Sequence, residues 1–588
     1  MGRFARFQKT DHSIPKTQLA WRIYGKGMEN FGDSRRNTGI PVVEPGDDEL
    51  LVRNDAVGLC FSDTKIIKFG SDHPRIQGRD LKNDPVIPGH EVSITVLKVG
   101  KKRAKDYTPG QRFIVQADAH YKGKSVSYGY VLPGGLCQYG IIGREILDGD
   151  VGSYLIPLHR EDIGYSEAAL VEPWACVVAA YRIEHRDGIK EGGALLIIGP
   201  EKSEKPWEFE GLFQGKNRVP GLIVFARISN ALKEKITKSI SRSGFKTVDA
   251  GNRLNPGQLE ELSKTHTGGK GFDDIIVLGD VQEELLAAAG DCMCANGILN
   301  YMAATSDSQP TRIDVGKVHY DRISFIGSTG NDVSVPYGEN RDYGIRGESV
   351  ILFGAGGPMG QMHVQLILED KTLKKRVIVT DIADDRLELL EEKFAPLAEK
   401  KGIDYHVLNP NSFESPEEFK KQVLEINGGR LFDYVVCLAA IPAVIEDASS
   451  YLGDRSVLNI FAGVSRGTIA KLNIKDVVTK SARYIGSSGS SLDDMVFTLR
   501  KVEERALDTD SAVAGVCGMN DVWNGIDAVR TGSFPGKIVV YPHIRNLNLV
   551  SLDELAVKHP KVGALLTENG SWTQKAEAQL LDEMLDIG

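Results

Sequence analysis

This sequence of 588 residues has no long apolar run, no cysteine framework and no excess of basic side chains. Without a run of about 18 apolar residues, no membrane-spanning helix is expected. Seven scattered cysteines, an odd number, argue against a set of disulfides and fit a reducing compartment. The net charge of −9 disfavours nucleic acid and anionic membranes as partners. Because residues 1–16 also lack the apolar stretch of a secretory signal, we expect a cytoplasmic protein without a membrane partner.

What remains is the composition of globular domains, with 41% hydrophobic and 26% charged residues. At about 100–200 residues per domain, the length predicts roughly three to five domains. Residues up to about 185 contain short extended runs between Gly, Pro and Asp turns, which is typical of a β-rich domain. From about Gly193 onwards strands and helices alternate, which indicates parallel α/β sheets.

The α/β region occurs twice. "GGKGFDDIIVLGD", "GILNYMA" and "HYDRISFIGSTG" in the first copy match "GGRLFDYVVCLAA", "SVLNIFAG" and "SARYIGSSG" in the second. The landmark pairs, at offsets of 160, 159 and 159 residues, are Phe272 with Phe432, Leu299 with Leu458, and Ile326 with Ile485. Equal, domain-sized offsets indicate a tandem duplication of one domain. We expect the two copies to pair within the chain through a shared sheet, which would cover an exposed sheet edge.

These patterns divide the chain into four predicted parts. They are a β-rich domain (1–188, completed by 505–545), a first α/β domain (189–335), a second α/β domain (346–504) and a helical tail (546–588). The strand "FPGKIVVYPHI" is expected to return to the β-rich domain, and "WTQKAEAQLLDEML" is the clearest helix of the tail.

A glycine-rich turn lies between an apolar strand and a helix in "ESVILFGAGGPMGQMHVQLIL". Glycines permit a tight turn and let backbone N–H groups approach a pyrophosphate at a helix N-terminus. The residues predicted to contact the dinucleotide are Gly354, Gly356, Gly357, Pro358, Met359 and Gly360. The turn is one residue too long for GxGxxG, so either Gly354 opens the motif with an insertion or Ala355 replaces its first glycine. The order of strand, turn and helix favours a dinucleotide site over a simple tight turn.

Asp381 is predicted to select the cofactor. It ends the next strand, "RVIVTD", 21 residues after Gly360. A carboxylate at this place accepts hydrogen bonds from both ribose hydroxyls and repels a 2′-phosphate. NAD is therefore expected in preference to NADP.

The first copy lacks these features. Its turn, "LLIIGPEKSEKPWEFEGLFQG", carries a long charged insertion with four glutamates in place of glycines. Its next strand ends in Ala226 and Arg227 instead of an acid, and an arginine without a glycine loop is weak support for a 2′-phosphate site. We expect a Rossmann-like domain with little or no dinucleotide affinity. "CMC" at 292–294 is interpreted as part of its buried core.

Three short motifs in the β-rich part contain candidate metal ligands. "GLCFSD" contains Cys60 and Ser62, "PVIPGHE" contains His90 and Glu91, and "ALVEPWAC" contains Glu172. A thiolate, an imidazole and a carboxylate suit a catalytic Zn²⁺ with one coordination position left open. Each residue alone is unremarkable, and only their combination predicts a metal site.

These motifs, together with "TPGQRFIV" and the cofactor loop, resemble those of zinc-containing medium-chain dehydrogenases, above all the sorbitol/polyol and sugar-alcohol-phosphate branch. The resemblance covers about 40–545 and treats the first α/β copy as an insertion. It implies an α/β protein with a GroES-like catalytic domain and two tandem Rossmann-type doubly wound domains, the first degenerate. It also implies a dehydrogenase with one catalytic Zn²⁺, NAD, and a polyol, sugar or sugar phosphate as substrate. Because relatives pair their nucleotide-binding domains between subunits, the resemblance allows a homodimer.

The resemblance also implies a role for each site residue. Cys60 and His90 would bind zinc. Either Glu91 or Glu172 would be the carboxylate ligand, and the sequence leaves this choice open. Ser62 would relay the proton of the substrate hydroxyl.

One segment departs from the relatives. Many of them carry a four-cysteine structural zinc lobe in the region that corresponds to 117–140, where this chain has only Cys137, so no structural zinc is expected. The same segment contains lysines and tyrosines that could hold a polyol or a phosphate, or form a solvated loop: Tyr121, Lys122, Lys124, Tyr128 and Tyr130.

Two other functions remain open at this point. The chain could be a zinc-free nicotinamide reductase that keeps the fold, although the set of Cys60, His90 and a glutamate argues against it. It could also be a nucleotide-binding sensor or scaffold without turnover, in which the duplicated domain binds a partner.

Overall fold

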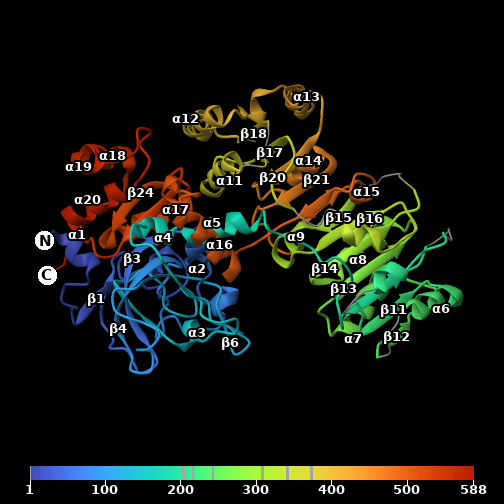
Figure 1. The fold of residues 1–588 in the computed structure, drawn as a ribbon, viewed down its shortest axis with the longest axis horizontal. Helices are drawn as coiled ribbons and strands as arrows, with labels where there is room; N and C mark the ends of the chain where they lie inside the picture. The colour runs from blue at the N-terminus through green and yellow to red at the C-terminus, as the bar shows by residue number, and fades with distance from the viewer. Residues whose placement is uncertain are drawn as a thin grey trace. The chain divides into compact units, whose positions relative to one another are not determined.

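The computed structural model describes residues 2–200, 205–214, 218–240, 244–305, 310–339, 343–370, 372 and 375–587. The chain forms two compact units, whose elements are labelled in Figure 1. Unit 1 comprises Met1–Val178, Gly357–Met362 and Gly489–Gly588, and unit 2 comprises Ala179–Gly356 and His363–Ser488. No described helix combines the length and the apolar character that a membrane span requires.

Unit 1 is built around an eight-stranded, mostly antiparallel sheet. Its strands are β3 (Leu50–Gly58), β4 (Glu91–Val99), β5 (Arg112–Val115), β8 (Tyr139–Ile142), β9 (Leu155–Pro157), β24 (Val513–Gly518), β25 (Lys537–Tyr541) and β26 (Val550–Ser551). Strand β3 is buried along its whole length, as a central strand should be. Strand β25 pairs with β3, so a segment from the end of the sequence completes the sheet that the first residues begin.

The helices of unit 1 bring the two ends of the chain together, as the N and C labels in Figure 1 show. They are α1 (Arg3–Gln8), α2 (Phe61–Phe69), α3 (Arg144–Leu147), α4 (Tyr165–Ala169), α5 (Val171–Ala179), α16 (Leu492–Glu503), α17 (Val522–Thr531), α18 (Leu552–Lys558), α19 (Pro560–Gly563) and α20 (Gln574–Met584). The backbone N–H of Phe4 donates to Asp582 at 2.9 Å. Glu577 of α20 accepts hydrogen bonds from the first two N–H groups of α4 at 2.6 and 2.7 Å. The helical tail therefore caps α4, which leads directly into α5.

Unit 2 contains two parallel six-stranded sheets with the same strand order. The first consists of β12 (Lys246–Asp249), β11 (Leu222–Ala226), β10 (Ala194–Ile198), β13 (Phe272–Leu278), β14 (Met293–Met302) and β16 (Ser324–Ser328). The second consists of β19 (Asp404–Leu408), β18 (Arg376–Thr380), β17 (Ser349–Phe353), β20 (Phe432–Cys437), β21 (Leu452–Ile460) and β23 (Arg483–Ile485). Within each copy this is the order 3-2-1-4-5-6 of the Rossmann fold, which confirms the predicted fold class.

The helices around the two sheets also follow the duplication. In the first copy they are α6 (Asn230–Ser239), α7 (Pro256–Thr267), α8 (Glu283–Asp291), α9 (Val315–Asp321) and α10 (Val335–Gly338). In the second copy they are α11 (Pro358–Glu369), α12 (Asp384–Lys401), α13 (Pro416–Ile426), α14 (Pro442–Ser449) and α15 (Ile474–Thr479). A fine detail is repeated too, because the register shifts between Phe272 and Asp274 in one copy and between Phe432 and Tyr434 in the other. A shared irregularity at equivalent places supports descent from one domain.

The two copies are joined by a two-stranded antiparallel ladder. Strand β15 (Thr311–Asp314) pairs with β22 (Ile469–Leu472). Thr311 lies opposite Leu472, and Ile313 lies opposite Ala470. At the duplication offset of 159 residues, Ala470 is the equivalent of Thr311 and Leu472 that of Ile313, so each copy presents the same positions to the other. The joint therefore has the self-complementary form of a two-fold dimer interface.

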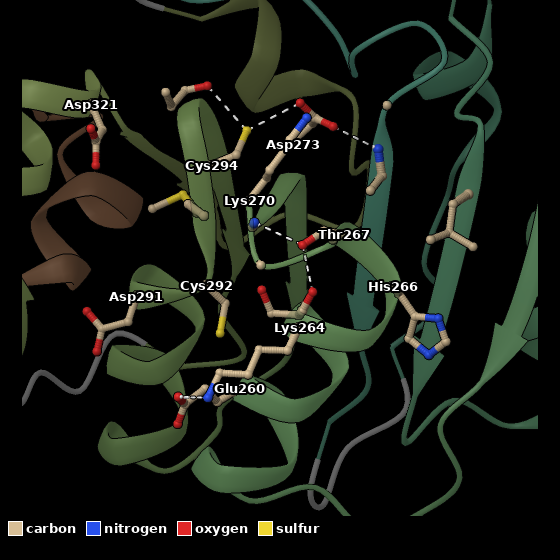
Figure 2. A pocket seen from close by; sticks show the side chains of 18 of the residues that line it. Glu260, Lys264, His266, Thr267, Lys270, Asp273, Asp291, Cys292, Cys294 and Asp321 are labelled. Carbon is tan, nitrogen blue, oxygen red and sulfur yellow. Dashed lines mark hydrogen bonds and ion pairs between the residues drawn. The ribbon is translucent and has the colours of Figure 1, made fainter.

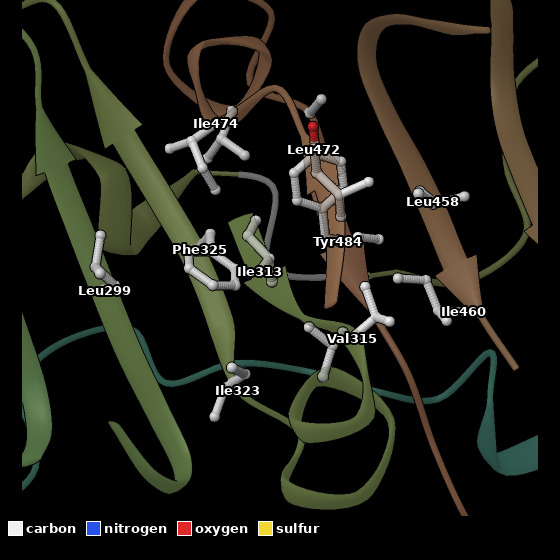
Figure 3. Close-up of a cluster of buried hydrophobic side chains, with 14 of the residues drawn as sticks. Leu299, Ile313, Val315, Ile323, Phe325, Leu458, Ile460, Leu472, Ile474 and Tyr484 are labelled. Atoms are coloured by element: carbon white, nitrogen blue, oxygen red, sulfur yellow. The ribbon is translucent and has the colours of Figure 1, made fainter. Parts of the chain in front are cut away.

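The predicted sheet between the two copies is present as this ladder, but it does not join the two six-stranded sheets edge to edge. In the part of the chain that the structure describes, β16 and β23, the last strands of the two sheets, form no ladder with each other. The copies meet instead through β15, β22 and a common apolar core, shown in Figure 3. Equivalent side chains from both copies lie in this core: Leu299 and Leu458, Ile313 and Leu472, Val315 and Ile474, and Phe325 and Tyr484. Between β16 and β23, burial of these side chains takes the place of backbone hydrogen bonds.

Contacts within unit 2 bring together the segments that flank the first copy. Tyr181, directly after α5, hydrogen-bonds through its hydroxyl to Nδ1 of His363 on α11, at 2.6 Å. The segment that follows α5 thus packs on the second copy, although the first copy comes next in the sequence. The rings of His185 and Tyr343, which flank the first copy, lie 5.6 Å apart. An inserted domain whose ends meet in this way leaves the host fold intact.

Candidate metal and dinucleotide sites

Cys60, His90 and Glu91 come together in unit 1. Cys60 is the N-cap residue of α2, and Glu91 is the first residue of β4, directly after His90. One ligand atom from each of the three residues lies within 4.8 Å of the other two. His90 and Glu91 are buried, and Cys60 is half-buried. Among the described residues, these three form the group of cysteine, histidine and acidic side chains that could hold a metal ion.

Asp63 organises this cluster, although the sequence analysis gave it no role. Its carboxylate accepts hydrogen bonds from the backbone N–H groups of Cys60 (3.0 Å) and Gly89 (3.2 Å). It also lies 3.4 Å from Nδ1 of His90, which is an ion-pair distance and not a hydrogen bond. Gly89 adopts a φ of 95°, a left-handed conformation that favours glycine. The available sequence signal for Asp63 was an acid three residues after a helix N-cap.

Lys537 is the second residue that the sequence analysis missed. Its Nζ donates to Glu91 Oε1 at 2.5 Å and to the backbone carbonyl of Leu59 at 2.7 Å. Both charged side chains are buried, and although burial lowers the pKa of Lys537, the charge of Glu91 raises it above its usual range. Since β25 brings this lysine from a distant part of the sequence, no local pattern could connect it with Glu91.

Oε2, the other carboxylate oxygen of Glu91, is not paired with Lys537. Oε2 is buried and has no hydrogen-bond partner among the described residues. It lies beside Gly58 on β3, where an added Cβ would come within 2.1 Å of it. An unpaired buried carboxylate oxygen is costly unless a cation or a proton satisfies it. This oxygen, next to a thiol and an imidazole, therefore fits a metal ligand.

Glu172 lies near the cluster but outside the set of three. It belongs to the first turn of α5, and Sγ of Cys176, one turn later, lies 3.9 Å from its Oε1. Burial raises the pKa of Glu172 to about 7, while His90 lowers it and Glu91 raises it further. Ser62, the second residue of α2, is half-buried beside Cys60 in the chain.

The lysine and tyrosine segment splits into two environments. Tyr128 and Tyr130 are buried in the core of unit 1. Lys122 and Lys124 are exposed on the tight hairpin of β6 (His120–Tyr121) and β7 (Lys124–Ser125). Tyr128 and Tyr130 therefore do not form one polar lobe with the lysines, because they follow the hairpin and pack into the core. Tyr130 is the member that reaches the cluster, with its ring centroid 5.6 Å from that of His90.

The glycine-rich loop follows β17 in the order that the sequence predicts. Gly354 adopts a φ of 77°, a left-handed conformation that favours glycine, and its N–H donates to the carbonyl of Thr380. Gly354 thus makes the tight turn, and Ala355 does not replace it. Gly357, Pro358, Met359 and Gly360 continue into the start of α11.

Asp381 follows β18 and is bound to this loop. Its Oδ2 accepts from the N–H of Gly356 at 2.8 Å, and its Oδ1 accepts from the N–H groups of Ile382 and Ala383. At Gly356 an added Cβ would lie 2.8 Å from Asp381 Oδ2, so a side chain there would displace the carboxylate. Loop and acid form one arrangement at the carboxyl ends of β17 and β18.

The corresponding part of the first copy has no such arrangement. Between β10 and β11 the described residues contain only the 3-10 turn η4 (Glu210–Phe213), so no α-helix N-terminus is available there. Trp207 and Phe209 are buried against the sheet in place of a helix. Two of the four glutamates predicted to repel phosphate, at 201 and 204, lie outside the described residues. Arg227, with a φ of 60°, takes the place that Asp381 has in the second copy.

A cavity of about 1270 Å³ lies at the other end of the first sheet, around the amino ends of β10, β11, β13 and β14 (Figure 2). Its charged side chains are largely paired with each other, as in Lys190 with Asp273 and Lys264 with Glu260. Cys292 is buried as predicted, Cys294 is half-buried, and both line this cavity. Ligands of open α/β sheets bind at the carboxyl ends of the strands, so the cavity is not a counterpart of the dinucleotide site.

One family model and several known proteins are similar to this chain in sequence. The model of the alcohol dehydrogenase GroES-like domain matches residues 46–148. L-sorbose 1-phosphate reductase of Klebsiella pneumoniae is 29% identical over 337 residues, which cover 54% of this chain and 76% of that protein. The uncharacterized protein YggP of Escherichia coli K12 is 30% identical over 330 residues, covering 54% of this chain and 74% of that protein. The chain belongs to the medium-chain dehydrogenase/reductase family, in its polyol dehydrogenase-like branch.

A third relative extends the similarity over nearly the whole length. Mannitol-1-phosphate 5-dehydrogenase of Aliivibrio fischeri is 23% identical over 563 residues, which cover 91% of this chain and 92% of that protein. The aligned length therefore includes the first α/β copy. As a member of this family, the chain is an oxidoreductase of the alcohol or polyol dehydrogenase type.

Proposed function

We propose that this enzyme uses zinc and NAD to interconvert a secondary alcohol and a ketone on a polyol, sugar or sugar phosphate. The observation that carries the proposal is the close grouping of Cys60, His90 and Glu91 in unit 1. The names of the relatives support the substrate class. We further propose that unit 1 supplies the catalytic domain, that the second copy holds NAD, and that the first copy has a packing role.

The donor set fits zinc. Thiolate, imidazole and carboxylate are the ligands that Zn²⁺ takes in catalytic sites, where three protein ligands leave one position open. The unpaired, buried Oε2 of Glu91 needs a cationic partner, and Lys537 already occupies Oε1. Asp63 fixes the backbone of both ligand-bearing segments, as residues outside a metal's own ligands commonly do.

The side chains around the cluster are proposed to have separate roles in the reaction. Zinc at this place would polarise the substrate hydroxyl as a Lewis acid, and NAD would accept the hydride. Ser62 is proposed to relay the proton of that hydroxyl: its Oγ accepts this proton while its own hydroxyl proton passes on towards solvent. Glu172, with a pKa near neutrality, can hold a proton at its carboxylate beside the cluster. Lys537 holds Oε1 of Glu91 in place through a buried ion pair.

NAD is proposed in preference to NADP because of Asp381. Its carboxylate is buried at the end of β18 and is held by three backbone N–H groups. A carboxylate has about four acceptor positions, so it can still accept from a ribose hydroxyl. A 2′-phosphate at the same place would meet its negative charge.

Metal analysis combined with a substrate screen tests the proposal. We expect one zinc per chain, and NAD reduction with polyols or their phosphates that stops on chelation and returns when zinc is added. Folding should survive chelation, because the cluster is a catalytic and not a structural site. Full activity of a metal-free preparation would refute the zinc assignment, and turnover with simple alcohols alone would refute the substrate class.

The proton relay has its own test. Ser62→Ala should retain zinc and NAD but lower the turnover number by about a hundredfold, since proton transfer by a positioned group contributes on that order. Ser62→Thr, which keeps a hydroxyl, is the matched control. If Ser62→Ala turns over at the wild-type rate across the pH range, the relay lies elsewhere.

A further inference from the structure

Arg75 lies one aromatic ring away from the proposed metal ligands. Its guanidinium carbon is 4.7 Å from the ring centroid of Tyr130, and the same ring is 5.6 Å from that of His90. Arginine stacks well on aromatic faces because its planar cation is weakly hydrated. The stack fixes the guanidinium next to the cluster and leaves its edge available for hydrogen bonds.

Asp118 pairs with Arg75 from another part of unit 1. Nη1 of Arg75 forms an ion pair with Oδ1 of Asp118, and the two side chains remain 38% and 42% exposed. In the described part of the chain, Asp118 is the side chain with which the guanidinium forms an ion pair. Asp118 is held in turn by Gln116, which accepts from its backbone N–H at 3.1 Å. The pair is thus fixed at its base but open to a ligand.

The local backbone also orients Arg75. The short turn η3 (Pro74–Ile76) begins after His73, whose Nδ1 accepts from the N–H of Arg75 at 3.3 Å. The ring of His73 lies 5.6 Å from that of Tyr130, so His73 and Arg75 both contact the same tyrosine. A cation fixed by a cap, an aromatic face and a carboxylate is better defined than the lysines on the exposed hairpin.

We propose that Arg75 determines specificity by donating hydrogen bonds to oxygen atoms at the substrate end remote from the reacting carbon. This inference rests on the proposed function, because it requires the reacting carbon to lie at the cluster. A guanidinium has five N–H donors, more than the ion pair of Nη1 with Asp118 requires. Hydroxyl and phosphate oxygens both accept such bonds, whereas a simple secondary alcohol has no oxygen at that end.

Asp118 distinguishes these two kinds of oxygen. A hydroxyl can donate to the carboxylate while it accepts from the guanidinium, so the pair suits a hydroxyl on both sides. A phosphate only accepts, and the negative charge of Asp118 would repel it. Removing the charge of Asp118 should therefore weaken the binding of a polyol and strengthen the binding of a polyol phosphate.

The experiment compares Arg75→Met with wild type on three compounds: a six-carbon polyol, its 1-phosphate and butan-2-ol. We expect KM for the preferred oxygen-rich compound to rise by about tenfold or more, since a hydrogen bond from a charged group is lost. KM and kcat for butan-2-ol should not change, and Arg75→Lys should restore part of the loss. Lys124→Met, which removes an exposed hairpin charge, is the matched control and should match wild type.

Calorimetric binding of the same compounds to the zinc-loaded protein supplies a readout without turnover. A loss of affinity in Arg75→Met for the polyol or its phosphate, together with the selective rise of KM, supports the proposal. The change of affinity in Asp118→Asn then shows whether Arg75 binds a hydroxyl oxygen or a phosphate oxygen. An equal loss on butan-2-ol, or unchanged affinity for both oxygen-rich compounds, would overturn it. A wild-type protein that binds these compounds but oxidises none would instead refute the proposed function.

Discussion

Glu91 and Glu172 lie close to the same cysteine and histidine, yet their surroundings differ. Glu91 forms a buried ion pair with Lys537 through one oxygen and presents a second buried oxygen without a partner among the described residues. Glu172 lies outside the close group, and its pKa is raised towards neutrality by burial. A carboxylate with an unpaired buried oxygen suits a metal ligand, whereas one that titrates near pH 7 suits proton handling. We therefore propose Glu91 as the ligand, a choice that the sequence left open.

Two matched substitutions test this assignment. Glu91→Gln should weaken zinc binding by at least about tenfold to a hundredfold, the loss that even supporting residues around a metal cause. Glu172→Gln should keep one zinc per chain and lower the turnover number instead. Zinc affinity is measured by competition with a chelator, with thermal unfolding as a control because Glu91→Gln leaves Lys537 without its partner. The reverse pattern would make Glu172 the ligand.

At the level of elements, the two copies differ most where a dinucleotide would bind. The second copy has a left-handed glycine, an α-helix start and a buried acid after β18. The described part of the first copy has a 3-10 turn and packed aromatic side chains in the same place. Exposed N–H groups at a helix N-terminus favour a pyrophosphate, and among the described residues of these turns the second copy provides them.

Asp381 and Arg227 occupy equivalent positions and form a matched pair of substitutions. Asp381→Ala should weaken NAD binding by about tenfold to a hundredfold, because a charge-assisted hydrogen bond is lost, and should narrow the gap to NADP. Arg227→Ala in the first copy should leave NAD affinity unchanged. Calorimetry should give one NAD per chain in the wild type. A second NAD, or a loss of affinity in Arg227→Ala, would show that the first copy retains a site.

At the level of the molecule, the duplication gives unit 2 an internal two-fold relation with one asymmetric feature. Lys475 of the second copy donates from its Nζ to Asp280 of the first copy at 3.0 Å. The equivalent residues in the opposite direction are Ala440 and Gly316. An added Cβ at Gly316 would come within 2.1 Å of the carbonyl oxygen of Ser465, so no lysine fits there. The ion pair can therefore form between a first copy and a second copy, but not between two first copies or two second copies.

Breaking this pair should loosen the joint between the copies. Lys475→Ala should lower the free energy of opening of β15 and β22 by about 1–3 kcal/mol, because Asp280 loses a charged hydrogen-bond partner. Hydrogen exchange of the two strands measures the change, and a double-mutant cycle with Asp280→Ala isolates the coupling between the two side chains. Additive effects of the two substitutions would show that the pair does not hold the copies together.

The common core should make the two copies unfold together. Leu472→Ala removes a fully buried side chain where the copies meet, and should cost about 2–5 kcal/mol. Hydrogen exchange should then increase in β14 and β16 of the first copy as well as in β21 and β23. Leu390→Ala on α12, equally buried but away from this core, is the control and should affect the second copy alone. Protection of the first copy in Leu472→Ala at the wild-type level would show that the copies are stable independently.

The sequence by itself determined the features that local chain order controls. The strand, glycine turn, helix and acid of the second copy are consecutive, so spacing alone predicted the loop at 354–360 and Asp381. The duplication was visible because equal offsets survive divergence, and the family motifs identified Cys60, His90 and Glu91 before any geometry was known. Each of these signals depends on residues that are neighbours in sequence or on a repeat of fixed length.

Only the tertiary structure decided what depends on contacts between distant segments. Lys537 reaches Glu91 because β25 pairs with β3, and Arg75 meets Tyr130 and Asp118 because three separate loops converge. The side chains that join the two copies likewise come from positions about 160 residues apart, and burial of their apolar surface favoured a packed core with one short ladder over a continuous sheet. No local pattern encodes such contacts, because they follow from the free energy of the whole packed arrangement.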